Sequence, residues 1–574
     1  MLRYILLWGL LLPLTAFAQQ FSKGTVVDEA NLPLMGAEVY WNGTQIGVST
    51  DDNGTFTLKR TENSNTLVIS YIGYKTKTIK VTNSEALHIQ LEPQSALEEV
   101  VVTQKRANTM KSQWQVANLH TMSSGELLKA ACCNLSESFS TNPSIDVNFS
   151  DAVTGNKQIK MLGLTSPYIL MAEENIPAMR GASQAYGLSF VPGTWIESIQ
   201  ITKGAGSVIN GYESISGQIN YEIEKPINAR PFFLNLYTSE DSRYELNAHT
   251  KVKLSDKWAT SLLAHGNVRQ RKSDHNHDGF IDNPIGNQIN LLNRWQYSNA
   301  EKGWVSFVNL NYMKDERQAG QINYNPLTDK GTTNAWGSEV NSERFTLSNK
   351  TGYVFPDTPY KSIGLQNSFQ SHRQDSYFGL NSYDIHQKSW YGNLIYNSII
   401  GNTQHKFATG LSGTYDDYNE QLTTSALAGD FSRIDRSVGA FFEYTYDNSS
   451  NFSFVAGVRA DSHNNLGNFI TPRFHLRYNP WKEATFRLSA GRGKRAANVI
   501  AENQQLLASS RQLHIVGGDG GKLYGLNPEI AWNYGASFLQ TFKIWGKNAE
   551  LSVDFYRTHF DNQVVVDLDH SPQQ

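Results

Sequence analysis

The sequence predicts a mainly β protein, with a large antiparallel sheet of membrane-spanning strands after an α+β domain and a small N-terminal β-sandwich. From about residue 231 apolar and polar side chains alternate with a period of two, so that each strand has one apolar face and one charged face. The connections between these strands are mostly short and long in turn, as in barrels that cross a bilayer. A soluble barrel would instead keep its apolar side chains inside.

The N-terminus has the pattern of a signal peptide. Arg3 precedes an apolar run over residues 4–14, and Ala16-Phe17-Ala18 forms a small-x-small cleavage site. The apolar run is too short for a membrane span. We expect residues 1–18 to be removed during secretion.

Composition and motifs exclude several classes of protein. The net charge of −3 argues against a strongly basic nucleic-acid binder, so we expect no nucleic-acid partner. After residue 18 no apolar run is long enough for a helical membrane span. The sequence has no His-Glu-x-x-His, Gly-x-Ser-x-Gly or phosphate-loop motif. We therefore expect no enzymatic activity and no required cofactor.

Residues 19–93 predict the N-terminal β-sandwich. Strand-like segments over residues 24–28, 33–39 and 69–74 accompany the turn Asp51-Asp52-Asn53-Gly54. The turn's polar residues are more typical of a glycine-closed hairpin than of a metal site. This region resembles the carboxypeptidase regulatory-like (transthyretin-like) domain that precedes many receptors of Bacteroidetes-type bacteria.

Residues 195–220 contain the most informative motif. A short strand runs into Lys203-Gly204, a segment of small residues through Gly211 follows, and a second strand begins at Gly217. This motif closely resembles the end of the plug domain in TonB-dependent outer-membrane receptors. The resemblance implies a plug over residues 119–226, and a helix is expected there over residues 123–131, capped by Ser123 or Ser124.

Residues 94–118 read as a linker that carries a short β-branched run. Such a run can add as an extra strand to the sheet edge of another protein. By resemblance to the family, this segment is the TonB box, which the energy-transducing TonB complex would bind; its residues are Glu99, Val100, Val101, Val102 and Thr103. The alternative is that the three valines form the last strand of the sandwich.

Residues 227–574 predict the membrane-spanning sheet. Tyr244 and Leu246 alternate with Glu245 and Asn247, and the same pattern returns near residues 474 and 551. We expect about fifteen strands of roughly ten residues each. Barrels of the family have 22 strands, so the resemblance implies an incomplete barrel and a C-terminally truncated chain.

Asp274, Asn276, Asp278 and Asp282 are spaced as oxygen ligands in a calcium loop, and Gly279 occupies the position of its sharp turn. A bidentate glutamate is missing, because Ile285 occupies its position. The sequence therefore predicts a possible structural Ca²⁺. Two alternatives stay open, namely a plain Asx-rich turn and a transition-metal site at the two histidines of the loop.

Sulfur side chains are concentrated in the expected plug, which holds half of the chain's eight methionines. Because thiolates and thioethers prefer soft ions, the following residues are candidates for contact with a metal cargo: Cys132, Cys133, Met161, Met171 and Met179. The alternatives are ordinary core packing and a disulfide between the adjacent cysteines.

Basic residues line the predicted inner face of the late strands at Arg487, Arg492, Lys494 and Arg495. They could steer an anionic chelate. We favour the alternative that they pair with plug carboxylates at Glu173, Glu174 and Glu213.

Together these patterns predict a monomeric TonB-dependent receptor in the cell outer membrane, surrounded by lipid, with its N-terminal domain and plug on the periplasmic side. The resemblance implies energy-driven uptake of a scarce nutrient, with a metal or a siderophore-type metal chelate as the leading cargo. A glycan or peptide importer of the same architecture and a non-transporting surface adhesin are the alternatives.

Overall fold

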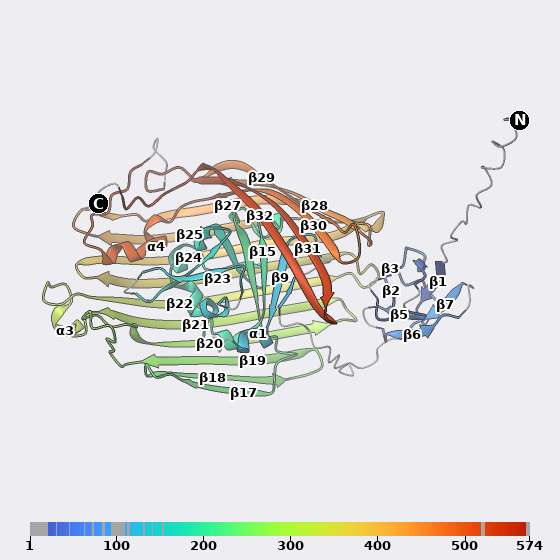
Figure 1. Ribbon diagram of the computed structural model, residues 1–574, viewed down its shortest axis with the longest axis horizontal. Coiled ribbons are helices and arrows are strands. Elements are labelled where there is room, and N and C mark those ends of the chain that lie inside the picture. The colour runs from blue at the N-terminus through green and yellow to red at the C-terminus, as the bar shows by residue number, and fades with distance from the viewer. Residues whose placement is uncertain are drawn as a thin grey trace, which may run out of the picture. The chain divides into compact units, whose positions relative to one another are not determined.

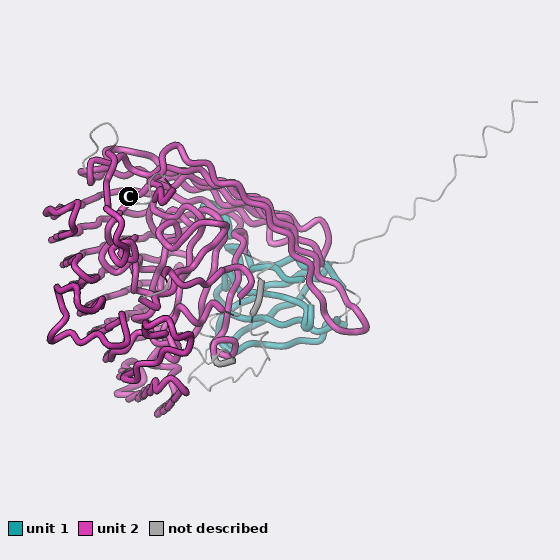
Figure 2. Tube along the Cα trace, turned by 60° about the vertical axis from the view of Figure 1, so that its left-hand side comes forward, with its two compact units in different colours: residues 1–104, 400–403 teal, residues 105–399, 404–574 magenta. Residues whose placement is uncertain are grey.

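In the computed structural model the chain forms two compact units, residues 1–104 with 400–403 and residues 105–399 with 404–574 (Figure 2). The structure describes residues 21–29, 31–44, 46–61, 64–71, 74–82, 86–92, 109–111, 115–129, 133–140, 142–151, 154–517 and 523–569. Figure 1 labels many of their strands and helices. Among them no helix is both long and apolar enough to cross a membrane.

The N-terminal unit is a β-sandwich, as predicted. One sheet has the order β4-β1-β7 and the other β3-β2-β5-β6. Their strands are β1 (Phe21–Val27), β2 (Glu38–Trp41), β3 (Gly47–Ser49), β4 (Thr55–Lys59), β5 (Thr66–Ser70), β6 (Lys77–Lys80) and β7 (Leu87–Gln90). Trp41 and Leu67 are buried between the sheets. Asp51 accepts hydrogen bonds from the Thr55 amide and hydroxyl, which is the expected hairpin turn.

The plug is a six-stranded sheet with small additions. The sheet has the order β14-β13-β16-β15-β9-β8, and a separate three-stranded sheet has the order β10-β11-β12. The strands are β8 (Thr109–Lys111), β9 (Leu119–Ser123), β10 (Asp146–Phe149), β11 (Lys157–Met161), β12 (Leu164–Thr165), β13 (Ile169–Glu173), β14 (Ile176–Pro177), β15 (Ile196–Lys203) and β16 (Gly217–Ile223).

The helices of the plug are short. The predicted helix is α1 (Ser124–Lys129), and α2 (Leu135–Ser138), which the sequence analysis did not predict, is capped by the side chain of Asn134. The described residues of the plug also form five 3₁₀ turns: η1 (Ser166–Tyr168), η2 (Gly181–Ser183), η3 (Gly187–Phe190), η4 (Gly193–Trp195) and η5 (Val208–Asn210).

The wall is one antiparallel sheet in which, apart from one short strand, each strand pairs with the next along the chain. Its strands are β17 (Phe232–Thr238), β18 (Arg243–Lys253), β19 (Trp258–Arg269), β20 (Ile285–Asn299), β21 (Trp304–Gly320), β22 (Gly337–Val354), β23 (Ser362–Phe378), β24 (Asn381–Ile400), β25 (Asn402–Thr423), β26 (Ala428–Asp430), β27 (Arg433–Asp447), β28 (Phe452–His463), β29 (Gly467–Tyr478), β30 (Ala484–Arg495), β31 (Glu529–Ile544) and β32 (Lys547–Asn562). Its long connections contain α3 (Pro326–Asp329), α4 (Val499–Glu502) and η6 (Gln504–Ala508).

The strand count agrees with the prediction of about fifteen. Fifteen strands follow one another from β17 to β32, and the short β26 pairs off this path with β25. Many strands are longer than the predicted ten residues; β25, for example, has 22. β17 and β32 end the order, and no pairing joins them among the described residues.

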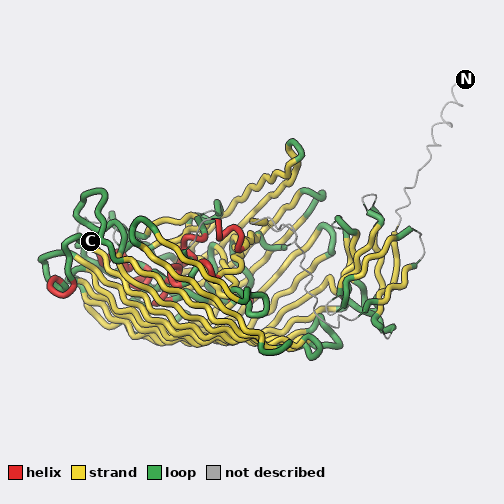
Figure 3. Tube along the Cα trace, turned by 90° about the horizontal axis from the view of Figure 1, so that it is seen from below, coloured by secondary structure: helices red, strands yellow, loops and turns green. Residues whose placement is uncertain are grey.

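The two faces of the wall differ as the alternation predicted. Tyr244 and Leu246 are exposed on the outer face, whereas Glu245 and Asn247 between them are buried. Figures 1 and 3 show the plug against the concave face of the wall, and the inward polar side chains contact it there. The wall therefore offers an apolar surface to lipid and a polar surface to the plug.

Candidate functional site at the plug–wall interface

The predicted plug motif forms the centre of the plug and one of its contacts with the wall. Strands β15 and β16 pair antiparallel, with Lys203 opposite Gly217. The Lys203 Nζ atom lies 2.6 Å from Asp554 of β32. Gly204 has a φ of +83°, which favours glycine. A Cβ atom on Gly217 would lie 1.9 Å from the Met161 methyl carbon, so this glycine permits close packing.

A buried ion pair holds the β13–β14 hairpin of the plug to the wall. Glu174 and Asn175, the two turn residues, have φ values of +49° and +66°. The Arg294 guanidinium of β20 donates a hydrogen bond of 2.5 Å to the Glu174 carboxylate, and both side chains are at most 3% exposed. Lys350 of β22 donates to the Glu174 carbonyl oxygen at 2.8 Å. The positive φ of a non-glycine residue is thus stabilised by contacts with the wall.

A second ionic contact joins the plug to strand β25 of the wall. Arg180 donates two hydrogen bonds to Glu213 at 2.8 and 3.0 Å and lies 3.6 Å from Asp416 of β25. Burial opposes ionisation of Glu213, but the charge and hydrogen bonds of Arg180 lower its pKa below the ordinary value. A cavity of about 50 Å³ adjoins this pair, and Met171 and Met179 are among its lining residues.

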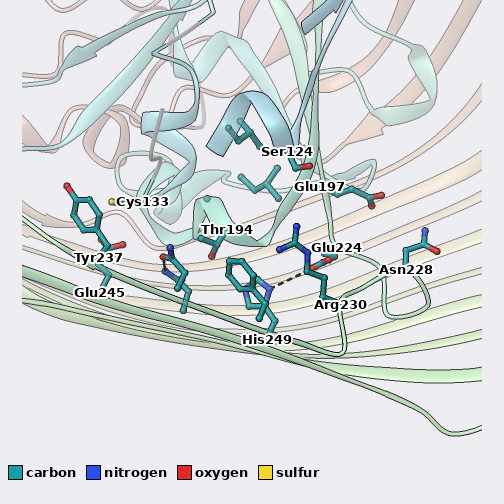
Figure 4. A pocket seen from close by; sticks show the side chains of 16 residues that line it. Ser124, Cys133, Thr194, Glu197, Glu224, Asn228, Arg230, Tyr237, Glu245 and His249 are labelled. Atoms are coloured by element: carbon teal, nitrogen blue, oxygen red, sulfur yellow. Dashed lines mark hydrogen bonds and ion pairs between the residues drawn. The ribbon is translucent and has the colours of Figure 1, made fainter. Parts of the chain in front are cut away.

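A cavity of about 400 Å³ lies between the plug and strands β17 and β18. Figure 4 shows its lining side chains, which include Cys133, Tyr237 and Glu245. The His249 Nδ1 atom lies 3.4 Å from the Glu224 carboxylate, and both residues also line this cavity. We call it the Cys133 cavity.

A second cavity of about 300 Å³ lies between the plug and strands β18–β21. Residues 283 and 284, in the connection before β20, line it together with Phe149 of the plug. Its charged lining residues are Glu137, Lys157, Arg243, Arg269, Asp315, Glu316 and Arg317. We call it the Arg269 cavity.

An ionic cluster lies between these two cavities. Arg243 of β18 lies 3.4 Å from Glu137 of α2 and also binds Glu245. Glu137 and Arg243 line the Arg269 cavity, whereas Glu245 and Cys133 line the Cys133 cavity. Burial opposes ionisation of Glu137, yet Arg243 and Lys157 lower its pKa. The ion pairs of Arg243 therefore link residues that line the two cavities.

The predicted sulfur residues do not form one site. Cys133 lines its cavity and is 7% exposed, and burial raises the pKa of its thiol. Met161, Met171 and Met179 belong to the main core of the plug. Cys132 lies outside the described residues. Core packing accounts for the positions of the methionines, and their contact with a cargo stays a prediction.

The predicted calcium loop has the hydrogen bonds of an Asx-rich turn. The Asp274 carboxylate accepts from the Asp278 and Gly279 amides. Asp282 accepts from the ring and backbone of His275, at 2.6 and 3.0 Å. Among the described residues no group of three or more acidic, histidine or cysteine side chains is arranged to hold a metal ion. Calcium binding here stays a prediction, as does the TonB box at residues 99–103, which lies outside the described ranges.

The expected pairing of the basic wall residues with plug carboxylates is borne out only in part. Arg495 forms its ion pairs with Glu502 and Glu529, both outside the plug, although its charge also helps to lower the pKa of Glu213 in the plug. The plug carboxylates are paired instead with residues that the sequence analysis did not single out, such as Arg180 and Arg294. Arg294 could have been noticed as an inward-facing charge in the alternating segment of β20, but its partner is 120 residues away along the chain.

The structure thus has a plug held by polar contacts against the polar face of a sheet whose other face is apolar. Three family models match the chain: a CarboxypepD_reg-like domain at residues 22–102, a TonB-dependent Receptor Plug Domain at 114–218, and a TonB dependent receptor-like beta-barrel at 264–574. The last covers more than half of the chain. This chain belongs to the TonB-dependent receptor family and is a protein of the cell outer membrane.

Curated relatives match parts of the chain. The TonB-dependent receptor SusC of Bacteroides thetaiotaomicron is 29% identical over 236 residues, which are 39% of this chain and 23% of that protein. A TonB-dependent receptor of Formosa agariphila is 33% identical over 98 residues, 16% of this chain and 9% of that protein. The matched segments span less than a quarter of the length of these relatives.

Solved structures share the fold. The siderophore receptor PirA of Acinetobacter baumannii has a TM-score of 0.62 at 14% identity, covering 80% of this chain and 73% of that one. The alcaligin outer-membrane receptor FauA of Bordetella pertussis has a TM-score of 0.60 at 13% identity, covering 81% and 75%. At these identities the likeness concerns the fold alone.

Proposed function

We propose that this chain takes up a small, scarce nutrient across the outer membrane, foremost a metal or a siderophore-type metal chelate, with energy from the TonB complex. The observation that carries the proposal is the plug, which buried ion pairs hold against the wall. Passage of a cargo requires contacts such as Glu174–Arg294 to separate. Breaking a buried ion pair costs several kcal/mol, roughly 3–5.

A bound cargo alone can shift the plug only by its differential affinity for the two plug positions. Uphill import therefore needs an external source of work. In our proposal the TonB complex supplies it through residues 99–103. The cavities at the plug–wall interface support the proposal, because the ionic cluster at Arg243 could separate to connect the Arg269 and Cys133 cavities.

Element-resolved accumulation tests the proposal. Iron, copper, zinc and cobalt are measured in cells with the receptor, without it, and with residues 99–103 deleted. We expect one metal to fall in the last two strains alike. Unchanged contents of all four metals in all three strains would refute a metal cargo.

A glycan or peptide cargo is the second candidate. Phe149 is 60% exposed and lines the Arg269 cavity together with amide side chains such as Asn267 and Asn287. An exposed ring beside amides suits a sugar or a peptide. Growth on glycan or peptide fragments, lost on deletion of residues 99–103, would favour this cargo. If that deletion leaves the receptor's function intact, a non-transporting adhesin is favoured.

A further inference from the structure

Within the described residues, one basic side chain of the Arg269 cavity has no carboxylate close enough to form an ion pair. Arg269 ends β19 and lies directly opposite Arg243 of β18 in the strand register. Like charges in directly opposite positions destabilise a sheet. Arg243 is neutralised by Glu137 and Glu245. Among the described residues Arg269 has no ion-pair partner of its own that would offset this repulsion at close range.

No acceptor among the described residues binds the Arg269 guanidinium. Its Nε atom is buried without a hydrogen-bond partner, and no carboxylate of the described part of the chain lies within 4.0 Å of its nitrogens. The acidic group of Asp241, on the connection before β18, accepts from Asn283 instead. A guanidinium left in this state binds anions strongly.

Every other charged residue that lines the cavity has a partner. Lys157 lies 3.4 Å from Glu137, and Arg317 lies 2.6 Å from Asp315. Glu316 lies close to Lys314 and accepts from Asn287. Arg269 is therefore the unpaired charge of this cavity, within the residues that the structure describes. A ligand that enters would find one open guanidinium among satisfied groups.

The other residues that line the Arg269 cavity indicate which kind of molecule would bear the anionic group. Phe149 exposes its ring to the cavity side, with the Lys157 Nζ atom 5.6 Å from the ring centroid. Several amide side chains also line the cavity, and its volume of about 300 Å³ admits a small molecule. A guanidinium binds a carboxylate through two parallel hydrogen bonds. The Phe149 ring and the amide side chains suit the hydroxylated remainder of such a ligand.

We propose that Arg269 binds a carboxylate of the cargo and thereby selects acidic, hydroxylated ligands. The proposal rests on the proposed uptake function and names a specificity residue for it. Two sources carry the same chemistry, namely an acidic sugar and a hydroxycarboxylate metal chelate. Trigalacturonate and ferric citrate represent them, and galactotriose is the neutral probe.

The test measures binding of the three probes to the purified full chain by calorimetric titration. We expect at least one acidic probe to bind, and Arg269→Gln to weaken it at least tenfold, as loss of a charged hydrogen bond does. Arg269→Lys should give an intermediate affinity, because lysine keeps the positive charge but cannot donate the two parallel hydrogen bonds of a guanidinium. Arg271→Gln is the matched control, since Arg271 is exposed and does not line the cavity.

Folding and transport are separated from binding. Arg269→Gln removes a like-charge pair, so its melting temperature should not fall below that of the unaltered chain. Deletion of residues 99–103 should abolish import and leave probe binding unchanged. If neither acidic probe binds, or if Arg269→Gln binds them as tightly as the unaltered chain, the inference is overturned. Intact binding without import would refute only the uptake function.

Discussion

The ion pair between Glu174 and Arg294 should determine how firmly the plug is docked. Glu174→Gln keeps the volume of the side chain but leaves Arg294, which is 0% exposed, without its counter-charge. Removing one partner of a buried pair costs about 3–5 kcal/mol. We expect about 3 kcal/mol, because the amide oxygen can still accept a hydrogen bond.

The assay is hydrogen exchange of the β13 amides, followed by mass spectrometry. A loss of about 3 kcal/mol corresponds to roughly a hundredfold faster exchange if the hairpin opens locally. The double variant Glu174→Gln/Arg294→Met should recover part of the protection, because it removes the unpaired charge.

Asp256→Asn is the matched control. It breaks the pair between Asp256 and Lys253, whose side chains are 94% and 60% exposed and 2.8 Å apart. Exposed pairs contribute about 0–1 kcal/mol, so β13 should exchange at the unaltered rate. Unchanged β13 exchange in Glu174→Gln would show that this ion pair does not hold the plug.

Three further predictions follow from single contacts. Because burial raises the thiol pKa of Cys133, a Cys132→Ser chain should react with maleimide far more slowly folded than unfolded; equal rates would contradict this burial. Asp282 raises the pKa of His275 through their hydrogen bond, so loop order should be lost as the pH rises through that pKa; NMR titration should show no such loss in Asp282→Asn. Gly217→Ala should lower the melting temperature by several degrees, since its Cβ atom would lie 2.6 Å from the backbone carbonyl oxygen of Thr202 as well as against Met161, and an unchanged value in calorimetry would contradict the packing.

Some features of the site could be predicted from local sequence and others could not. The plug motif at Lys203 and Gly217 was recognisable because its strand, turn and strand are contiguous. The unpaired state of Arg269 was not predictable, because it depends on which strand lies beside β19 and on the partners that Arg243 finds in the plug. The alternating pattern places a charged side chain on the inner face of the wall, but it does not indicate which residue that side chain will contact.

The sequence by itself determined the class of fold, the order of the domains and the two faces of the wall, since a period of two and turn residues are properties of neighbouring positions. Only the tertiary structure decided the pairing across the interface. Glu174 meets Arg294 over 120 positions, and Lys203 meets Asp554 over 351. Such contacts depend on the register of many strands and on the seating of the plug, because no local pattern records which distant charge will share a buried site.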